Sequence, residues 1–197
     1  TEQVIDRQSD SCDLYFIVEG RARVVNYSLS GREVTFDDRE GGQYFGELAA
    51  LDGEPRSANV VALENTVVAC LSREGFHELL MDYPQVAVKI LMNLAKIVRI
   101  STDRIMDLST LGANNRVHAE LLRLAKPGMK DDNTAVISPI PIHGDIASRV
   151  STTRETVARV FSDLTREGIL QRDRDALIIL DVDHLTEIVE QVRGEGD

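Results

Sequence analysis

The feature that most restricts the fold of this 197-residue chain is a regularly spaced seam near its middle. Seven positions follow one another at alternating intervals of four and three residues: Ala87, Leu91, Leu94, Val98, Ser101, Ile105 and Leu108. Three heptads of this kind are typical of a helix that packs side by side with a second helix. The alternative is one amphipathic helix that packs on its own domain.

One member of the seam, Ser101, is polar, and Thr102 places a second hydroxyl beside it. Polar residues in such a seam lower stability, so they usually fix a register or bind a ligand. The pattern therefore predicts a dimerisation helix with a polar feature in its seam. The expected dimer contacts are Leu91, Leu94, Val98, Ser101, Ile105 and Leu108.

The residues before this helix follow the short period of β-strands. Five runs rich in β-branched and aromatic residues lie between Asp13 and Leu71: "LYFIVEG", "ARVVNY", "EVTFDD", "NVVAL" and "TVVACL". Turn residues such as Gly20 and Gly41-Gly42 separate them at short intervals. This arrangement predicts an antiparallel sandwich or barrel.

The charge of the chain is uneven. A formal net charge of −11 argues against general attraction to nucleic acid. Residues 1–82 hold 16 acidic and 7 basic side chains, whereas residues 143–174 hold 5 acidic side chains and 6 arginines. The C-terminal segment is therefore the part of the chain in which nucleic-acid contacts are expected.

Other features of the sequence limit where the protein can be located in the cell and whether it can be an enzyme or bind a metal. No run of 18 apolar residues and no signal peptide occur, so we expect a cytoplasmic protein without a membrane partner. Cys12 and Cys70 fit neither a metal-type spacing nor a disulfide framework. The four histidines are scattered and have no visible nucleophile beside them, so we expect neither an enzyme nor a metal site.

The C-terminal third predicts two helices joined by a tight turn. "HGDIASRV" indicates a short helix, and "STTRETVARVFSDLTREGIL" indicates a turn followed by a longer helix. Arg154, Glu155 and Arg159 lie off the apolar stripe near the start of the longer helix. Arginine can pair with guanine and glutamate can accept from cytosine, which would suit the major groove of DNA. A solvated helix face with a Glu155–Arg159 pair is the alternative.

The segment after the longer helix, "ILQRDRDALIIL", predicts a hairpin, or wing. Its Arg172 and Arg174 could contact phosphates.

The remaining motif lies in the strand-rich part, where "FGELA" is followed by "PRSA". Glu47 and Arg56 stand nine residues apart there, around a stretch of small residues. A carboxylate accepts from a hydroxyl and arginine pairs with phosphate oxygens, so a small ligand that has both groups would fit.

These motifs and their order resemble the CRP/FNR family of bacterial transcription regulators over essentially the whole chain. "FGELA" with "PRSA" is similar to the family's cassette for cyclic nucleotides, and "TTRETVARV" is similar to its recognition helix. The resemblance implies an α+β fold. Its parts would be an N-terminal antiparallel β-barrel or jelly-roll effector domain (residues 1–83), a long dimerisation helix (84–110) and a C-terminal winged helix-turn-helix domain (111–197).

The resemblance also assigns the ligand site. Glu47 would take the ribose 2′-hydroxyl, Arg56 would pair with the cyclic phosphate, and Ser101 and Thr102 would reach the purine, one from each subunit. The implied effector is cyclic AMP or cyclic GMP, with cyclic AMP favoured, and no other cofactor is expected. The full predicted set is Gly46, Glu47, Leu48, Ala49, Arg56, Ser57, Ala58, Ser101 and Thr102.

For DNA, the resemblance implies a homodimer on a two-fold symmetric site with TGTGA-like half-sites, and RNA polymerase as a further partner. The residues expected to contact DNA are Thr152, Thr153, Arg154, Glu155, Arg159, Arg172 and Arg174.

Two other interpretations of the function remain open at this point. One is a family member that senses another effector, such as haem, or no effector, although His77 in "GFHELL" fits an ordinary helix after the barrel. An iron–sulfur sensor is excluded because it would need clustered cysteines. The other is a cyclic-nucleotide module that regulates a partner protein, which would have no need of a recognition helix.

Overall fold

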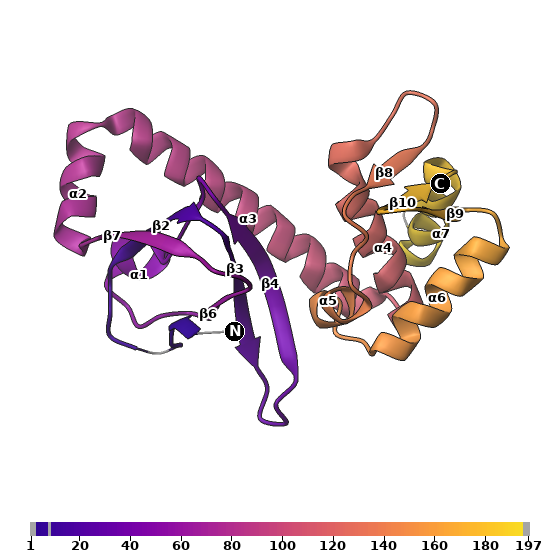
Figure 1. Ribbon diagram of the computed structural model, residues 1–197, viewed down its shortest axis with the longest axis horizontal. Helices are drawn as coiled ribbons and strands as arrows, with labels where there is room; N and C mark the ends of the chain where they lie inside the picture. Colours follow the sequence, from indigo (N-terminus) through magenta and orange to yellow (C-terminus); the bar gives the residue numbers. More distant parts are fainter. Residues whose placement is uncertain (1–2, 8, 195–197) are drawn as a thin grey trace. The chain divides into compact units, whose positions relative to one another are not determined.

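The structure, a computed structural model, describes residues 3–7 and 9–194. It divides the chain into two compact units, residues 1–98 and 99–197, and helix α3 (Pro84–Thr110) runs from the first into the second. The expected fold class is confirmed, because a β-sheet domain, a long helix and a helix-turn-helix domain follow in that order (Figure 1). The three-part division at residues 83 and 110 stays a prediction. Within the described ranges, no helix is long and apolar enough to cross a membrane.

The first unit contains two antiparallel sheets. One has the strand order β1-β6-β3-β4 and the other has the order β5-β2-β7. The strands are β1 (Gln3–Ile5), β2 (Leu14–Glu19), β3 (Arg21–Tyr27), β4 (Glu33–Glu40), β5 (Tyr44–Phe45), β6 (Asn59–Ala62) and β7 (Val67–Leu71). All five predicted strands are present. Strands β1 and β5 were not predicted, since two or three residues are too few to show a period.

Two apolar clusters stabilise this unit. Between the sheets lie Ile5, Ile17, Ala22, Phe45 and Val60, all buried. The second cluster joins three helices to strand β2: α1 (Glu47–Asp52), α2 (Arg73–Asp82) and the first half of α3. Helix α2 is the helix predicted after the barrel, and Nε2 of His77 lies 2.9 Å from the carbonyl oxygen of Ala50. The short helix α1 is thereby fixed on its buried side.

The second unit packs helices around a small antiparallel sheet of order β8-β10-β9. Its elements after α3 are α4 (Ala113–Ala125), a short 3₁₀ turn (Lys126–Gly128), β8 (Ala135–Ile137), α5 (His143–Arg149), α6 (Arg154–Arg166), β9 (Leu170–Asp173), β10 (Ala176–Ile179) and α7 (Val182–Arg193). The apolar stripe that the sequence predicts for α6 is buried: Val157, Val160, Phe161 and Leu164. The helix pair and the hairpin are thus confirmed.

A buried cluster of charges joins the end of α3 to the rest of the second unit. Asp107 and Glu120 are only 3% and 2% exposed. Asp107 accepts hydrogen bonds from Arg123 and Arg193, and Glu120 accepts one from Arg123 at 3.0 Å and lies 3.7 Å from Arg104. Burial lowers the pKa of Arg123, but Glu120 and Asp107 more than reverse this, so its pKa is raised. These five residues, the Asp107–Glu120 charge cluster, connect α3, α4 and α7.

Removing one acid from this cluster should destabilise the second unit strongly. Asp107→Ala leaves Arg123 and Arg193 without their shared acceptor, and we expect a loss of about 2–4 kcal/mol in the free energy of unfolding. The control is Asp163→Ala, which breaks an exposed pair with Arg166 and should cost no more than about 1 kcal/mol. Urea unfolding followed by circular dichroism measures both. Equal losses for the two variants would contradict this account of the cluster.

Candidate ligand and nucleic-acid sites

The predicted ligand cassette begins where strand β5 passes into helix α1. Gly46 is the N-cap of α1 and has a left-handed backbone with φ of 89°. A Cβ atom added there would lie 2.5 Å from Nη1 of Arg56. Both the backbone angle and the contact therefore require glycine at this position. The close approach brings Arg56 back against the start of the helix.

Arg56 is a buried cross-link in the cassette, with only 3% of its surface exposed. Its Nη1 donates to the carbonyl oxygen of Gly46 at 2.9 Å, its Nη2 to that of Asp13 at 2.6 Å, and its Nε to Oγ of Ser11 at 3.1 Å. Its guanidinium carbon also lies 5.7 Å from the centre of the Tyr15 ring. Arginine carries five N–H groups, so these three bonds leave two that the described residues do not use. Arg56 can hold the loop and still bind an anion.

Glu47 is the first residue of α1 and is 8% exposed. In the described part of the chain, no hydrogen bond reaches its carboxylate. The carboxylate oxygens still reach solvent, so they are open to a ligand that supplies a hydroxyl. The structure thus brings Glu47 and Arg56 to the same end of α1, beside Gly46.

The other predicted cassette residues differ in exposure. Ala49 is buried, Ala58 is half-buried, and Leu48 and Ser57 are exposed. The carbonyl oxygen of Ser57 accepts from the side-chain amide of Asn26 at 3.2 Å. The loop after Arg56 is therefore tied to strand β3.

The two hydroxyl residues predicted for the purine lie on α3. Ser101 and Thr102 are both exposed and belong to the second compact unit. Their contribution to the ligand site stays a prediction.

The predicted seam of α3 is mostly open in the single chain. Leu91, Val98 and Ile105 are 62–64% exposed and Leu108 is 49% exposed, whereas Leu94 is half-buried against the apolar cluster of the first unit. Packing of α3 on its own domain therefore accounts for Leu94 but leaves most of the seam uncovered.

Helix α6 presents the residues that the sequence predicts for DNA. Thr153 caps the helix by accepting from the backbone N–H of Thr156 at 3.2 Å. Arg154, Glu155 and Arg159 are exposed, and no ion pair between Glu155 and Arg159 occurs among the described residues. Hydrogen bonds from its own backbone N–H and from the Thr153 hydroxyl lower the pKa of Glu155. Glu155 is thus an ionised acceptor in solvent.

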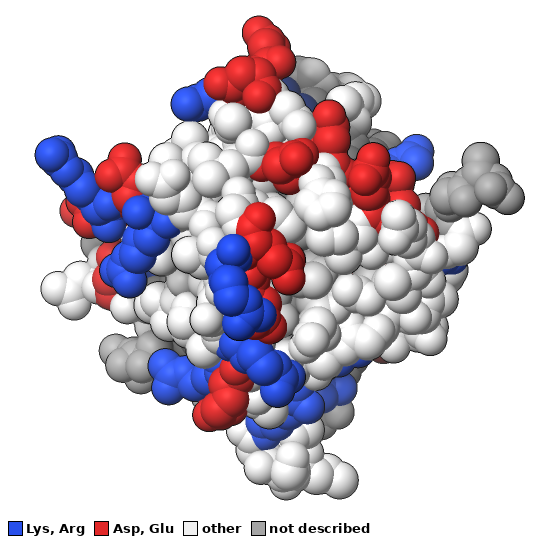
Figure 2. Space-filling model, turned by 90° about the vertical axis from the view of Figure 1, so that its right-hand side faces the viewer, with Lys and Arg blue, Asp and Glu red and all other residues white. Residues whose placement is uncertain are grey.

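Figure 2 looks onto the side that carries the second unit in Figure 1. Basic side chains form a band down this face, with acidic ones beside it and uncharged surface around it. The basic side chains on this face are thus gathered locally and do not make the whole face basic.

The turn between α5 and α6 is held by Arg116, a residue that the sequence analysis did not single out. Ser151 has a left-handed φ of 54°. Arg116 of α4 donates to the carbonyl oxygens of Val150 at 2.8 Å, Ser151 at 3.1 Å and Leu111 at 2.9 Å. Because the acceptors are backbone atoms, no residue type or spacing in the sequence points to Arg116. Its role is to fix the angle at which α6 leaves the turn.

The hairpin of β9 and β10 carries the two predicted wing arginines, both exposed. Arg174 occupies the turn with a left-handed φ of 43°, which is unfavourable for a residue other than glycine. Within residues 3–7 and 9–194, no hydrogen bond or ion pair involves its side chain. The wing therefore holds a free cation at a strained position.

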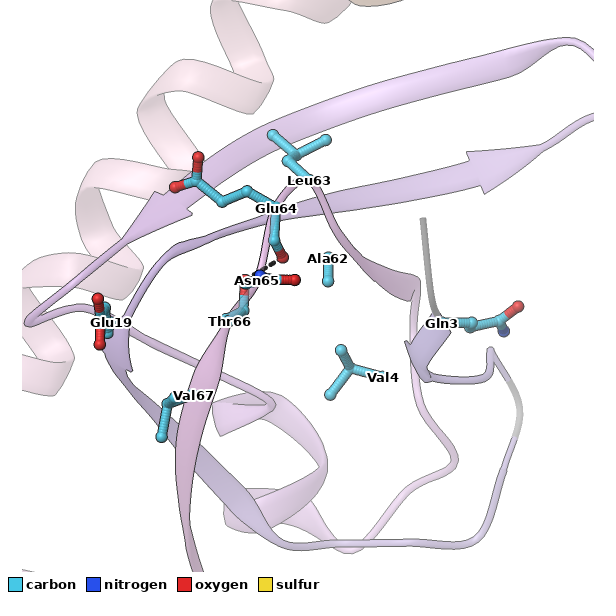
Figure 3. Close-up of a pocket in the computed structure, with 9 residues that line it drawn as sticks. All are labelled: Gln3, Val4, Glu19, Ala62, Leu63, Glu64, Asn65, Thr66 and Val67. Atoms are coloured by element: carbon cyan, nitrogen blue, oxygen red, sulfur yellow. Dashed lines mark hydrogen bonds between the residues drawn. The ribbon is translucent and has the colours of Figure 1, made fainter.

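One open hollow of about 830 Å³ lies elsewhere in the first unit, at the ends of β1, β6 and β7 (Figure 3). Gln3, Glu19, Glu64 and Thr66 are among its lining residues, and none of the predicted ligand-binding residues is. The Thr66 hydroxyl donates to the carbonyl oxygen of Arg21 at 3.0 Å. This hollow is thus separate from the cassette.

No group of three His, Cys, Asp or Glu side chains in the described residues could hold a metal ion.

Comparison with known proteins defines the class. Residues 1–83 match the family model of the cyclic nucleotide-binding domain, and residues 115–188 match that of the Crp-like helix-turn-helix domain. The chain is thus a regulator that joins these two domains. The "Cyclic AMP receptor protein" of Thermus thermophilus is 34% identical over 158 residues, which cover 80% of this chain and 70% of that protein. The chain belongs to the CRP/FNR family of transcription regulators, which bind DNA and are not enzymes.

Solved structures support the same fold. A CooA mutant from Carboxydothermus hydrogenoformans matches with a TM-score of 0.83 at 21% identity, over 95% of this chain and 84% of that one. The c-di-GMP responsive global regulator CLP of Xanthomonas campestris matches with a TM-score of 0.72 at 19% identity, over 90% and 89%. At these identities the likeness shows the fold alone.

Relieving the strain in the helix-turn-helix should stabilise the protein. Ser151→Gly keeps the carbonyl that Arg116 binds and removes the unfavourable left-handed side chain, so we expect a gain of about 0.5–1 kcal/mol. Gly168→Ala is the matched reverse change, since Gly168 has φ of 77° and no neighbour within 4 Å of an added Cβ. It should lose about 1 kcal/mol. Thermal unfolding of both variants checks this, and a destabilised Ser151→Gly would show that the serine side chain is needed.

Proposed function

We propose that this chain is a DNA-binding transcription regulator that is switched by a cyclic nucleotide. The observation that carries the proposal is the pair in the cassette: Glu47, a largely buried residue whose carboxylate has no donor in the described chain, and Arg56, a buried guanidinium with unused N–H groups. Glu47 would accept from the ribose 2′-hydroxyl, and Arg56 would bind the cyclic phosphate. Ser57 and Ala58 would complete the phosphate site with backbone N–H groups.

The fold alone does not select the effector, since the CLP regulator described as c-di-GMP responsive has the same architecture. The cassette favours a ligand with one sugar hydroxyl and one phosphate in close proximity. We favour cyclic AMP over cyclic GMP because the Thermus relative is named a cyclic AMP receptor protein. Ser101 and Thr102 would contact the purine and are able to donate or accept for either base.

The exposed seam of α3 supports a homodimer. Leu91, Val98, Ile105 and Leu108 form an apolar row that a second copy of the helix would cover. In such a dimer two copies of α6 would face half-sites one helical turn apart, about 34 Å, on a two-fold symmetric DNA site. RNA polymerase is the further partner that we propose for a transcription regulator, and the cytoplasm is the location.

The switch would be a shift in population between two arrangements of the dimer. A ligand changes such a balance only by the difference between its affinities for the two states. Contacts between the ligand and α3 that form in only one of the two arrangements would supply this difference in affinity. The recognition helices would then match the DNA spacing in the ligand-bound state.

Binding of the ligand is tested best at Glu47. Glu47→Gln keeps the size of the side chain and removes the charge that the 2′-hydroxyl would pair with, so cyclic AMP affinity should fall by about 1.5–3 kcal/mol, or tenfold to a hundredfold. Arg56 is a less suitable target, because its loss would also unpair the carbonyls of Gly46 and Asp13. Calorimetric titration measures the change. The control Glu64→Gln alters an exposed acid outside the cassette, and equal affinities for both variants would refute the assignment.

The dimer is tested at Leu91. Leu91→Glu should place two like charges in the seam and produce monomers at micromolar concentration. Met92→Glu is the matched control, because Met92 is 68% exposed on the same turn but lies off the seam, so that variant should stay dimeric. Light scattering gives the mass of each. A monomeric unmodified protein would rule out the proposed dimer.

Recognition of the DNA sequence is tested by comparing a variant in α6 with a variant in the wing. Arg159→Ala should lose about 1–3 kcal/mol per half-site on the matched sequence and discriminate less at one base pair. Arg174→Gly removes a cation from the wing turn without straining it, so it should weaken all sequences alike and lower the salt slope by about one per subunit. Binding titrations at several salt concentrations measure both. A uniform loss for Arg159→Ala would make Arg159 a phosphate contact.

A further inference from the structure

A tyrosine just before the cassette faces the long helix instead of the barrel interior. Tyr44 and Phe45 form strand β5, and adjacent side chains on a strand point to opposite faces. Phe45 belongs to the cluster between the sheets and stacks on Tyr15 at 5.3 Å. Tyr44 packs with the other cluster, where its ring meets Phe16 edge-on at 6.3 Å. That cluster also contains Ile90 of α3.

The hydroxyl of Tyr44 is bound by this same helix. Nδ2 of Asn93 donates to Oη of Tyr44 at 2.9 Å. An amide nitrogen only donates, so the phenol oxygen is the acceptor here and its own O–H remains able to donate. No residue in the described ranges accepts that hydrogen. The contact lies wholly within the first compact unit, since both residues precede position 98.

Tyr44 packs against the turn of α1 that begins with the cassette carboxylate, because Ala50 and Leu51, three and four residues after Glu47, belong to the same cluster. Burial raises the pKa of Tyr44, the bond from Asn93 lowers it, and the charge of Glu47 raises it. Glu47 has the carboxylate without a donor in the described chain, and Tyr44 is the neighbouring hydroxyl without an acceptor. A hydrogen bond from the phenol to the carboxylate would satisfy both groups.

We infer that Tyr44 is a positioning residue: its O–H donates to the carboxylate of Glu47 when ligand is bound, while Asn93 of α3 holds its oxygen. The inference rests on the proposed cyclic-nucleotide function. It ties the group that recognises the sugar hydroxyl to the dimerisation helix through two hydrogen bonds. Ligand contact at Glu47 would thus act directly on the first half of α3.

Packing alone does not explain the hydroxyl. A phenylalanine would fill the same space and keep the edge contact with Phe16, and an apolar residue at position 93 would suit the neighbouring Ile90 and Leu94. A partly buried hydroxyl and amide are unfavourable unless they are paired. Because the two groups already pair with each other, an apolar pair would serve packing equally well, so the choice of a hydroxyl and an amide fits a role in positioning.

The test compares two ligands that differ only in the 2′-hydroxyl. The full chain, Tyr44→Phe, Asn93→Leu and the double variant are titrated calorimetrically with cyclic AMP and with 2′-deoxy cyclic AMP. Tyr44→Phe should weaken cyclic AMP binding about tenfold and leave 2′-deoxy binding nearly unchanged, because only the hydroxyl contact depends on an oriented Glu47. Asn93→Leu should act in the same direction, and the double variant should be no weaker than Tyr44→Phe.

Tyr27→Phe, an exposed tyrosine of strand β3, is the control and should change neither affinity. If Tyr44→Phe and Asn93→Leu weaken both ligands equally, Tyr44 has only a structural role and the inference is wrong. It is also wrong if both variants keep the full preference for cyclic AMP. If the unmodified chain binds neither nucleotide, the proposed function itself fails, so the two failures are distinguishable.

Discussion

The arrangement of the second unit depends on two acids that are almost fully removed from water. Asp107 and Glu120 are tolerated only because three arginines reach them. Separating the last turns of α3 from α4 and α7 would leave the buried carboxylate of Asp107 without its arginine partners. These turns are therefore part of the core of the second unit and not a linker. The first turns of the same helix are held differently, by apolar contacts at Ile90 and by the bond from Asn93 to Tyr44.

Periodic features could be predicted from the sequence, and pairwise polar contacts could not. The five longer strands, α3 and the buried stripe of α6 all repeat a spacing that burial requires. Strands β1 and β5 are too short to show one. Glu47 and Arg56 stand out because the motif around them is local. The partners of Arg116, and two of the three partners of Arg56, are backbone carbonyls that carry no residue identity. The Asp107–Arg193 contact spans 86 positions, and nothing in the sequence marks it.

In the described part of the second unit, residues 99–194, three residues other than glycine hold left-handed backbones, and two of them are compensated within the chain. The carbonyl of Ser151 is bound by Arg116, and Asn133 accepts from the backbone N–H of Asp183 while it donates to Asp181 at the start of α7. Arg174 shows no such compensation in the described residues. Strained backbone positions cluster at functional sites, which fits the proposal that the wing contacts DNA.

The open seam of α3 also affects how such a regulator would respond to its own abundance. In the proposed dimer, Leu91, Val98 and Ile105 are covered only when two copies meet, so single copies and pairs would be in equilibrium. Below the dissociation constant of the pair, the number of assembled molecules varies with the square of the chain concentration, so halving expression would lower operator occupancy about fourfold. The rate of synthesis of the protein would then be a second input to the genes it controls, independent of the effector.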